Sequence, residues 1–223
     1  MSKSGVGSYR AQGDVIVERL RELKSPRELT ESITAFTSAH GQYCAAADVT
    51  TAAEKKRDAA LAAVAKADAE GLDPSVEALA DAMVGAAMGK RKNPFQGLSL
   101  HAPGAMKELA YADEVKAVRA LTDKVRAAKT TAALTKALDA CDATAATVTA
   151  KLKALTLAQT RYEVALSARD KLLPAWSRSR ARLKKKAAGA WVDEEETYRA
   201  VFAAPDAVRA PVAKRPKKPG TPK

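Results

Sequence analysis

One heptad stripe, running from about residue 131 to residue 188, constrains the fold of this chain more than any other feature. Small or apolar residues recur there at alternating steps of four and three, interrupted only by Gln159, Arg169 and Arg180. The stripe consists of Leu134, Leu138, Cys141, Ala145, Val148, Leu152, Leu155, Gln159, Tyr162, Leu166, Arg169, Leu173, Trp176, Arg180, Leu183 and Ala187. A 3.5-residue repeat sustained this long predicts one long helix that needs a partner helix along most of its length.

The same chain offers such a partner between residues 27 and 70. Its stripe consists of Leu29, Ile33, Phe36, His40, Tyr43, Ala47, Thr50, Glu54, Arg57, Leu61 and Val64. Glu54 and Arg57 stand at core positions, so either the buried face rotates onto the alanine-rich side of the helix or the two charges pair along it. A second copy of the chain would serve equally well as the partner.

Helix signals also mark the ends of these elements. Ser25-Pro26 with Glu28 predicts a capping box at the start of the first long helix, and Gly71 predicts its end. Pro174 predicts a kink near Leu173, or a break with a new helix starting at the proline.

Shorter helices are predicted over residues 12–24, 73–89, 105–129 and 193–204. The connection between the second and third of these, residues 90–104, is rich in Pro, Gly and Asn. Its apolar side chains are expected to tuck against the bundle, and they are Phe95, Leu98 and Leu100.

The composition favours helices over sheets. Alanine, the best helix former, is abundant, whereas the chain holds only five Tyr, three Phe and two Trp. Residues typical of strands are scattered and do not alternate with polar ones. The sequence therefore predicts an all-α fold, an elongated antiparallel helical bundle that is coiled-coil-like and contains no sheet.

Weak self-similarity indicates an internal duplication. Residues 18–24 align with residues 123–129 at a shift of 105, and Arg57-Asp58 aligns with Arg169-Asp170 at a shift of 112. The two shifts differ by one heptad, which leaves the apolar faces nearly in register.

This duplication predicts two repeats, each made of a short, a long and a short helix. The first repeat covers residues 10–90 and the second residues 105–204, joined by a linker over residues 91–104 and packed together as a single bundle. Residues 1–9 are expected to form a flexible leader. Residues 205–223, which are basic and rich in proline, are expected to be a disordered tail.

Residues that could support catalysis or hold a metal are scarce. The two histidines, His40 and His101, belong to no helical Glu-x-x-His pair, and neither Cys44 nor Cys141 has a histidine at a recognisable family spacing. His40 precedes Cys44 by four residues, which predicts a packing contact. The sequence therefore predicts no enzyme, no cofactor and no metal, and two small buried thiols rather than a disulfide or a redox pair.

The charge of the chain says more about possible partners than these residues do. Lys and Arg exceed Asp and Glu, which gives a net charge of +12. One basic cluster ends the second long helix and consists of Arg178, Arg180, Arg182, Lys184, Lys185 and Lys186. Another lies in the tail and includes Lys214, Arg215, Lys217 and Lys218. These residues could neutralise phosphates of nucleic acid or anionic lipid; alternatively, the first cluster is a solvated face that complements the helix dipole.

The tail segment Lys-Arg-Pro-Lys-Lys-Pro resembles the Pro- and Lys-rich tails of linker-histone-like bacterial proteins and of some granule-coating phasins. That resemblance implies non-specific attraction to polyanions. The start of the chain lacks the apolar run of a signal peptide, and no window resembles a membrane span, so a cytoplasmic location is expected.

The leading prediction is a non-enzymatic helical scaffold or adaptor that mediates protein–protein interaction, with another protein or a second copy as its partner. One alternative is a nucleoid- or polyanion-associated protein that binds DNA non-specifically through the tail and residues 178–186. Another is a granule- or membrane-surface coat, for which an anionic membrane is the weaker partner. No small-molecule substrate is evident.

Overall fold

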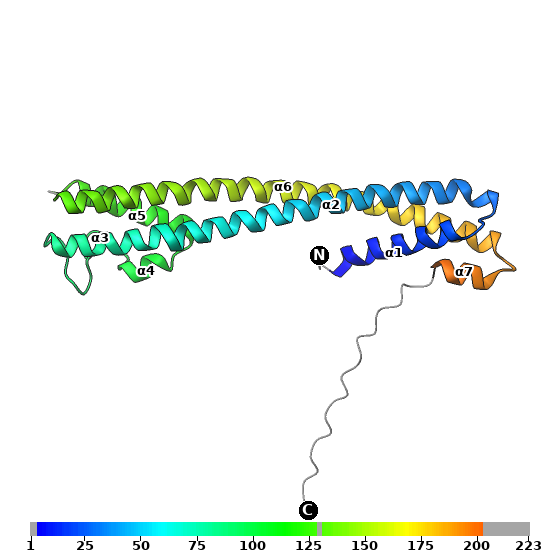
Figure 1. The fold of residues 1–223 in the computed structure, drawn as a ribbon, viewed down its shortest axis with the longest axis horizontal. Coiled ribbons are helices and arrows are strands. Elements are labelled where there is room, and N and C mark those ends of the chain that lie inside the picture. Colours follow the sequence, from blue (N-terminus) through cyan, green and yellow to red (C-terminus); the bar gives the residue numbers. More distant parts are fainter. Residues whose placement is uncertain (1–3, 129–130, 203–223) are drawn as a thin grey trace, which may run out of the picture. The chain divides into compact units, whose positions relative to one another are not determined.

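The computed structural model describes residues 4–128 and 131–202, and this part of the chain is helical, with no strand (Figure 1). The predicted all-α fold of long packed helices is confirmed. The α-helices are α1 (Ser4–Glu22), α2 (Thr30–Ala67), α3 (Asp73–Gly85), α4 (Pro103–Lys107), α5 (Tyr111–Arg126), α6 (Ala132–Ala190) and α7 (Glu195–Phe202). A 3₁₀ turn, η1 (Arg27–Leu29), precedes α2, and a π-helical turn, η2 (Asp68–Leu72), joins α2 to α3.

The chain divides into two compact units. Unit 1 draws on residues 1–48 and 168–223, and unit 2 on residues 49–167. The long helices α2 and α6 contribute to both units, and in each unit they run antiparallel (Figure 1).

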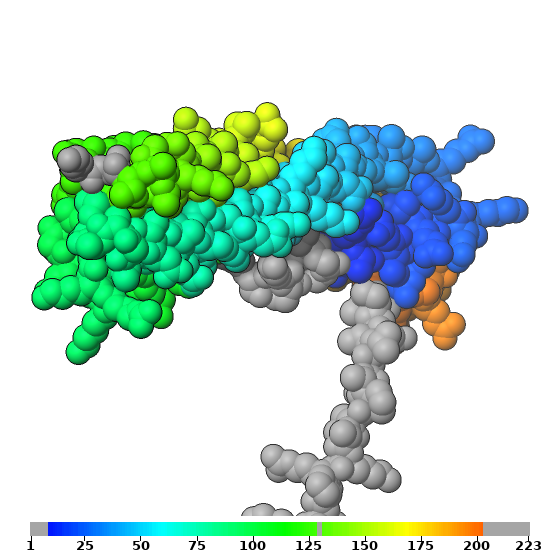
Figure 2. All heavy atoms as spheres, turned by 60° about the vertical axis from the view of Figure 1, so that its left-hand side comes forward, coloured from blue at the N-terminus to red at the C-terminus, as the bar shows by residue number. Residues whose placement is uncertain are grey.

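The core of unit 1 is rich in aromatic side chains. Phe36 and Tyr43 of α2 surround Trp176 of α6, with ring centroids 5.8 Å and 6.5 Å from the indole. Helix α7 packs against α1 (Figure 2), where the Arg19 guanidinium donates to the Val201 carbonyl oxygen at 3.5 Å. Large rings packed this closely bury much apolar surface.

The core of unit 2 is aliphatic and lies where α3, α5 and the first half of α6 meet. Its fully buried side chains include Leu79 of α3, Val118 of α5 and Leu138 of α6. Phe95, from the connection before α4, is also fully buried in this core.

Helix α6 confirms the predicted seam. Every residue of its heptad stripe is buried or partly buried. The stripe is most deeply buried from Leu134 to Val148 and from Trp176 to Ala187, and only partly buried over most of the stretch from Leu152 to Leu173.

Each polar residue in this stripe has a neighbour on its own helix. The Gln159 amide donates to the Glu163 carboxylate at 2.6 Å, and the Arg169 guanidinium pairs with Asp170 at 2.6 Å. The guanidinium of Arg180 lies 6.0 Å from the centre of the Trp176 ring.

The partner stripe on α2 is confirmed except at Leu61, which is 49% exposed. Ala60 and Ala63 are partly buried beside it, so the buried face does rotate towards alanine at this turn. The core charges also pair, because Arg57 contacts Glu54 at 3.4 Å and lies 4.4 Å above the centre of the Tyr162 ring. Both expected ways of accommodating these charges therefore occur.

The predicted capping box at the start of α2 is wrong. The chain enters α2 through the 3₁₀ turn, whose N-cap, Pro26, makes no side-chain cap hydrogen bond. The Ser25 hydroxyl is buried and has no hydrogen-bond partner within the described residues. Proline at the cap position cannot supply the side-chain oxygen that a capping box requires.

The predicted helix end at Gly71 is also wrong, because the chain stays helical from α2 through the π turn into α3. Buried residues Val64, Asp68, Leu72 and Val76 recur at steps of four. In a regular α-helix three such steps rotate the face by about 120°, and the extra residue of a π turn absorbs most of that rotation. Pro74 favours the irregularity, since it has no N–H for the helical ladder.

Other boundaries differ from the predictions in detail. Helix α3 ends at Gly85 rather than at residue 89, and Ala87 follows with a positive φ of 59°. The expected helix over residues 105–129 is divided between α4 and α5. Leu100 is fully exposed and does not pack on the core, whereas Leu98 is partly buried as expected.

Helix α6 contains Pro174 without an interruption, so the expected break there did not occur. The alternative, a kink near Leu173, stays a prediction.

Helix α1 begins at Ser4, inside the expected leader. The element order, apart from α4, is short, long and short twice over, and the duplication itself stays a prediction. The described helices include none that is long and apolar enough to span a bilayer. The predicted disordered tail lies outside the described residues.

Candidate functional site

The basic cluster at the end of α6 divides between exposed and partly buried positions. Arg178, Arg182 and Lys185 are spaced by four and three residues, so they share one exposed face of the helix. The opposite face carries the buried Trp176 and Leu183. The three cations therefore form an outward row, as a polyanion-binding helix requires.

Two cations of the cluster, one of them in the row, pair with an acid, and two others lie apart from the row. Glu31 of α2 accepts from Arg182 at 2.9 Å and lies 3.7 Å from the Lys186 ammonium, so one carboxylate partly neutralises two cations. Arg180 is partly buried against Trp176, and Lys184 points away from the row. Lys214, Arg215, Lys217 and Lys218 lie outside the described residues.

A second surface was not predicted, although a signal for it exists in the sequence. In unit 2, α6 carries Ala143, Ala150, Leu157 and Val164 at intervals of seven residues, and all four are exposed. Leu157 is 52% and Val164 64% exposed, and they stand one heptad apart in this row. We call these four residues the outer stripe, because they face away from the seam residues Leu155 and Tyr162. Figure 2 shows the yellow-green middle of α6 uncovered at the surface.

Cations flank the middle of the outer stripe, whereas Asp139, four residues before Ala143, is an exposed acid at its start. Lys153 and Arg161 are exposed on the same side of α6 as Leu157. The nearest acid on this stretch of helix, Glu163, lies towards the seam and accepts from Gln159. The outer stripe is therefore an apolar row whose middle is flanked by cations.

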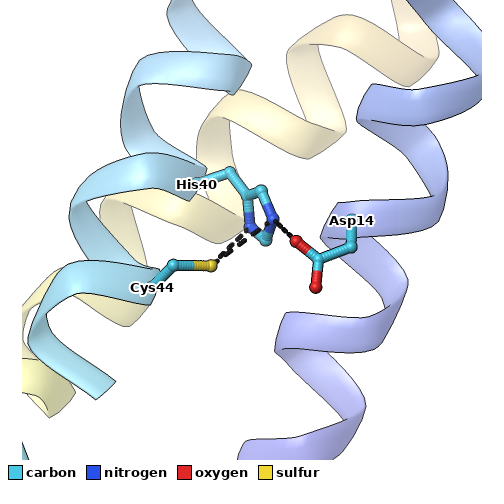
Figure 3. A group of neighbouring side chains, drawn as sticks. All are labelled: Asp14, His40 and Cys44. Atoms are coloured by element: carbon cyan, nitrogen blue, oxygen red, sulfur yellow. Dashed lines mark hydrogen bonds and ion pairs between the residues drawn. The ribbon is translucent and has the colours of Figure 1, made fainter. Parts of the chain in front are cut away.

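A third arrangement joins α1 to α2 in unit 1 (Figure 3). The His40 Nε2 atom lies 2.9 Å from the Asp14 carboxylate and 3.5 Å from the Cys44 sulfur. On the other side of the ring, the Trp176 indole N–H donates to Nδ1 at 3.2 Å. His40 is 5% exposed and stacks on Phe36, with ring centroids 5.9 Å apart. The contact between His40 and Cys44 that the sequence predicts is confirmed.

This arrangement differs from a cysteine–histidine–aspartate nucleophile. In such a triad the thiol and the carboxylate bind opposite nitrogens of the imidazole. Here Asp14 binds Nε2, and the Cys44 sulfur lies beside the ring, 3.5 Å from Nε2 and 3.8 Å from Nδ1, which already accepts from Trp176. Because Nδ1 accepts from Trp176, the ring proton belongs on Nε2, where it donates to Asp14. Burial and then the Asp14 charge raise the pKa of Cys44, while Arg10 opposes them, so the thiol keeps its proton at neutral pH.

The same hydrogen bonds disfavour a metal at this cluster. Asp14, His40 and Cys44 offer three ligand atoms close together. A metal on Nε2 would move the ring proton to Nδ1, and that proton would then point at the Trp176 N–H. Histidine ligands normally donate their second N–H to an acceptor, so the indole occupies the wrong side of the ring. The cluster is best described as a buried polar contact that joins α1, α2 and α6.

A fourth arrangement consists of three carboxylates in unit 2, which sequence analysis did not single out. Asp68 lies in the π turn, Asp73 begins α3, and Glu114 is in the first turn of α5. One oxygen from each lies within 4.8 Å of the other two. Glu114 is fully buried and Asp68 is 7% exposed.

A signal for this cluster is present in the sequence. Glu114 precedes Val118 by four residues, which places it on the buried face of α5, and Asp68 follows the buried Val64 by four. Burial, and then the close approach of the Asp68 and Asp73 carboxyl groups, together raise the pKa of Glu114 to about 8. Burial likewise raises the pKa of Asp68.

Comparison with known proteins supplies no relative, since no family model, curated protein or solved structure matches this chain. The assignment of a function therefore rests on these surfaces and clusters.

Proposed function

We propose that this protein is a non-enzymatic helical scaffold that binds an amphipathic helix with acidic flanks along the outer stripe of α6. The observation that carries the proposal is the exposed heptad row of Ala143, Ala150, Leu157 and Val164. A row with this period fits the apolar face of one further helix, in the manner of coiled-coil packing.

The flanking charges select the partner. Lys153 and Arg161 stand beside Leu157, whereas the exposed acid on this face, Asp139, lies at the start of the row and is paired with Arg126 of α5. A second copy of the chain docked by this face would place cations against cations, which is unfavourable when apolar surface excludes water. Glutamate or aspartate at the flanking positions of the partner would instead form complementary pairs.

The non-enzymatic part of the proposal is supported by the state of the thiols and of His40. The ring of His40 is held by Asp14 and Trp176, and both cysteines have raised pKa values because they are buried. A nucleophile of this kind needs a lowered pKa and a base with a free lone pair.

The test uses a designed probe, a fluorescent three-heptad peptide with Leu at its core positions and Glu at its flanking positions. A matched peptide carries Lys in place of Glu. Fluorescence anisotropy with the full-length protein should show binding of the Glu peptide alone, weakened at least about tenfold by the double variant Leu157→Asp, Val164→Asp. The matched control is Val49→Asp on α2, a residue that is 60% exposed and outside the stripe.

Equal binding of the Glu peptide to wild type and to the double variant would refute the docking surface. So would a Leu157-dependent dimer in sedimentation velocity, because it would make a second copy the occupant. Binding of both peptides with equal affinity would reject the role of Lys153 and Arg161.

The row of Arg178, Arg182 and Lys185 favours a second candidate function, non-specific binding of a polyanion such as DNA. Each phosphate neutralised by such a row releases counterions, so affinity should fall steeply between about 50 and 200 mM salt. The variant Arg178→Gln, Arg182→Gln, Lys185→Gln should flatten that dependence, whereas Lys116→Gln, an exposed lysine of α5, should not. A salt dependence that the triple variant leaves unchanged would remove this surface from consideration.

A further inference from the structure

We propose that Asp68, Asp73 and Glu114 form a binding site for a divalent cation of the hard, oxygen-preferring class, such as Ca²⁺, Mg²⁺ or Mn²⁺. The site lies within unit 2 and is separate from the outer stripe.

The first argument is the burial of unpartnered oxygen atoms. Both carboxylate oxygens of Glu114 are buried, and neither has a hydrogen-bond partner among the described residues. One buried oxygen of Asp68 and one of Asp73 are in the same condition. Burying such atoms without a partner is strongly unfavourable. Two of these carboxyl groups can bond each other only when one keeps its proton, whereas a single ion could bind all three.

The second argument is geometric. Oxygen ligands lie about 2.1 to 2.6 Å from Mg²⁺ or Ca²⁺, so two ligands on opposite sides of the ion are roughly 4 to 5 Å apart. The three carboxylates meet this condition, with one oxygen of each lying within 4.8 Å of the others. A fully buried glutamate thus lies close to two aspartates, at a separation that one cation could bridge.

The fold holds these groups in place from three sides. The π turn carries Asp68, and the N–H of Asp73 donates to the Asp68 carbonyl oxygen, which fixes the spacing of the two aspartates. Glu114 approaches from α5, where the neighbouring Val115 and Val118 are buried in the core of unit 2. π turns of this kind often occur at functional sites.

The charges indicate which ligand fits. Three carboxylates carry a formal charge of −3 when ionised, and a divalent ion offsets more of it than a single proton does. The ammonium of Lys107 on α4 interacts electrostatically with Asp73 and Glu114, but it is already paired with Glu77 at 2.5 Å. With oxygen donors alone and no histidine or cysteine, the cluster suits Ca²⁺, Mg²⁺ or Mn²⁺ better than Zn²⁺.

The experiment uses full-length protein treated with EDTA and then dialysed free of it. Isothermal titration with CaCl₂, MgCl₂ and MnCl₂ should show one bound ion per chain for at least one of the three. At about 1 mM, the same ion should raise the melting temperature by several degrees, as a ligand of the native state must. Glu114→Gln should weaken binding at least about tenfold, whereas Asp81→Asn, an exposed carboxylate on α3, should leave it unchanged.

A further readout separates ligation from folding. Because Glu114→Gln removes one of three crowded acidic groups, the ion-free variant should be at least as stable as the ion-free wild type, and the ion should no longer shift its melting temperature. Should that variant fail to fold, Asp73→Asn, at a less buried position, provides the same comparison.

The competing explanation is that the carboxylates share protons instead of an ion. In that case none of the three ions binds the wild type stoichiometrically at pH 7.5, and the proposal is overturned. Unchanged affinity in Glu114→Gln and Asp73→Asn would overturn it as well, by placing the ion elsewhere.

Discussion

The imidazole of His40 packs so closely against α1 at Gly13 that a β-carbon at that position would overlap the ring. Gly13 is buried and lies in the interior of the helix, where glycine is normally unfavourable. The missing side chain therefore allows α1 to approach the ring that binds Asp14 and Trp176.

Gly13→Ala should destabilise the protein even though alanine is the better helix former. Overpacking of this kind costs about 1 to 3 kcal/mol, which exceeds the gain in helix propensity of up to ~1 kcal/mol. The free energy of unfolding, measured by urea titration and circular dichroism, should fall. The matched control is Gly41→Ala on α2, where nothing lies within 4 Å of the added carbon and stability should rise. A gain in both variants would contradict the contact.

The hydrogen bonds of His40 predict a single tautomer of its neutral imidazole. Nδ1 accepts from the Trp176 N–H, so the proton should be on Nε2 and directed at Asp14. Nitrogen-15 NMR distinguishes the two ring nitrogens by chemical shift and should report Nδ1 as the unprotonated one. The same spectrum of Trp176→Phe should show a mixture of tautomers. A proton found on Nδ1 in the wild type would mean that the indole does not donate to it.

Truncation of seam leucines should have graded effects along α6. Leu138 is fully buried, and its replacement by alanine should cost about 2 to 5 kcal/mol. Leu152 and Leu155 are only partly buried, so the same change should cost roughly half as much there. The heptad stripe alone predicts full burial of both residues and therefore a larger loss of stability. Urea unfolding of the three variants gives the order directly. Equal losses at all three positions would contradict the difference in burial.

The two thiols should differ in reactivity. Burial, and then the Asp142 charge, raise the pKa of Cys141 to about 12, and its S–H donates to the Ser75 carbonyl oxygen at 3.1 Å. Cys44 is partly exposed, with a pKa raised mainly by burial. In a titration with a disulfide reagent, Cys44 should react slowly at pH 7 and faster as pH rises above 9, while Cys141 should react only after denaturation.

These shifts also predict the effect of pH on stability. A thiol pKa raised above the unfolded value of 9.0 means that the folded state holds its proton more tightly. Below pH 9 both states are protonated and the thiols add no pH dependence, whereas stability should fall as pH rises from 9 towards 12. Cys141→Ala should reduce that loss in alkaline urea titrations. An unaltered slope in this variant would assign the loss to other groups.

The predictable parts of the fold are those set by local periodicity. The seam from Leu134 to Ala187 could be predicted because each of its residues follows from the last by a helical step, whatever the partner. The pairing of Glu54 with Arg57 could also be predicted, since side chains three residues apart meet on any helix. The helix end predicted at Gly71 is wrong because the burial of Leu72 and Val76 outweighs the preference of glycine for helix ends.

The candidate sites were less accessible to sequence reasoning. The row of Arg178, Arg182 and Lys185 follows from spacing, but its partial neutralisation by Glu31 depends on how α2 lies beside α6. The outer stripe has a period of seven that could have been found, yet only the structure distinguishes an exposed row of apolar residues from a buried one.

The sequence by itself determined the helical class of this protein and the buried face of its longest helix, because both arise from intrinsic propensity and from side-chain spacing along one element. The tertiary structure alone decided which distant groups meet. Glu114 reaches Asp68 and Asp73 only because α5 packs over the π turn, and Trp176 reaches His40 only because the aromatic core of unit 1 orients the indole. Those encounters depend on the relative rotation of packed helices, which no local pattern specifies.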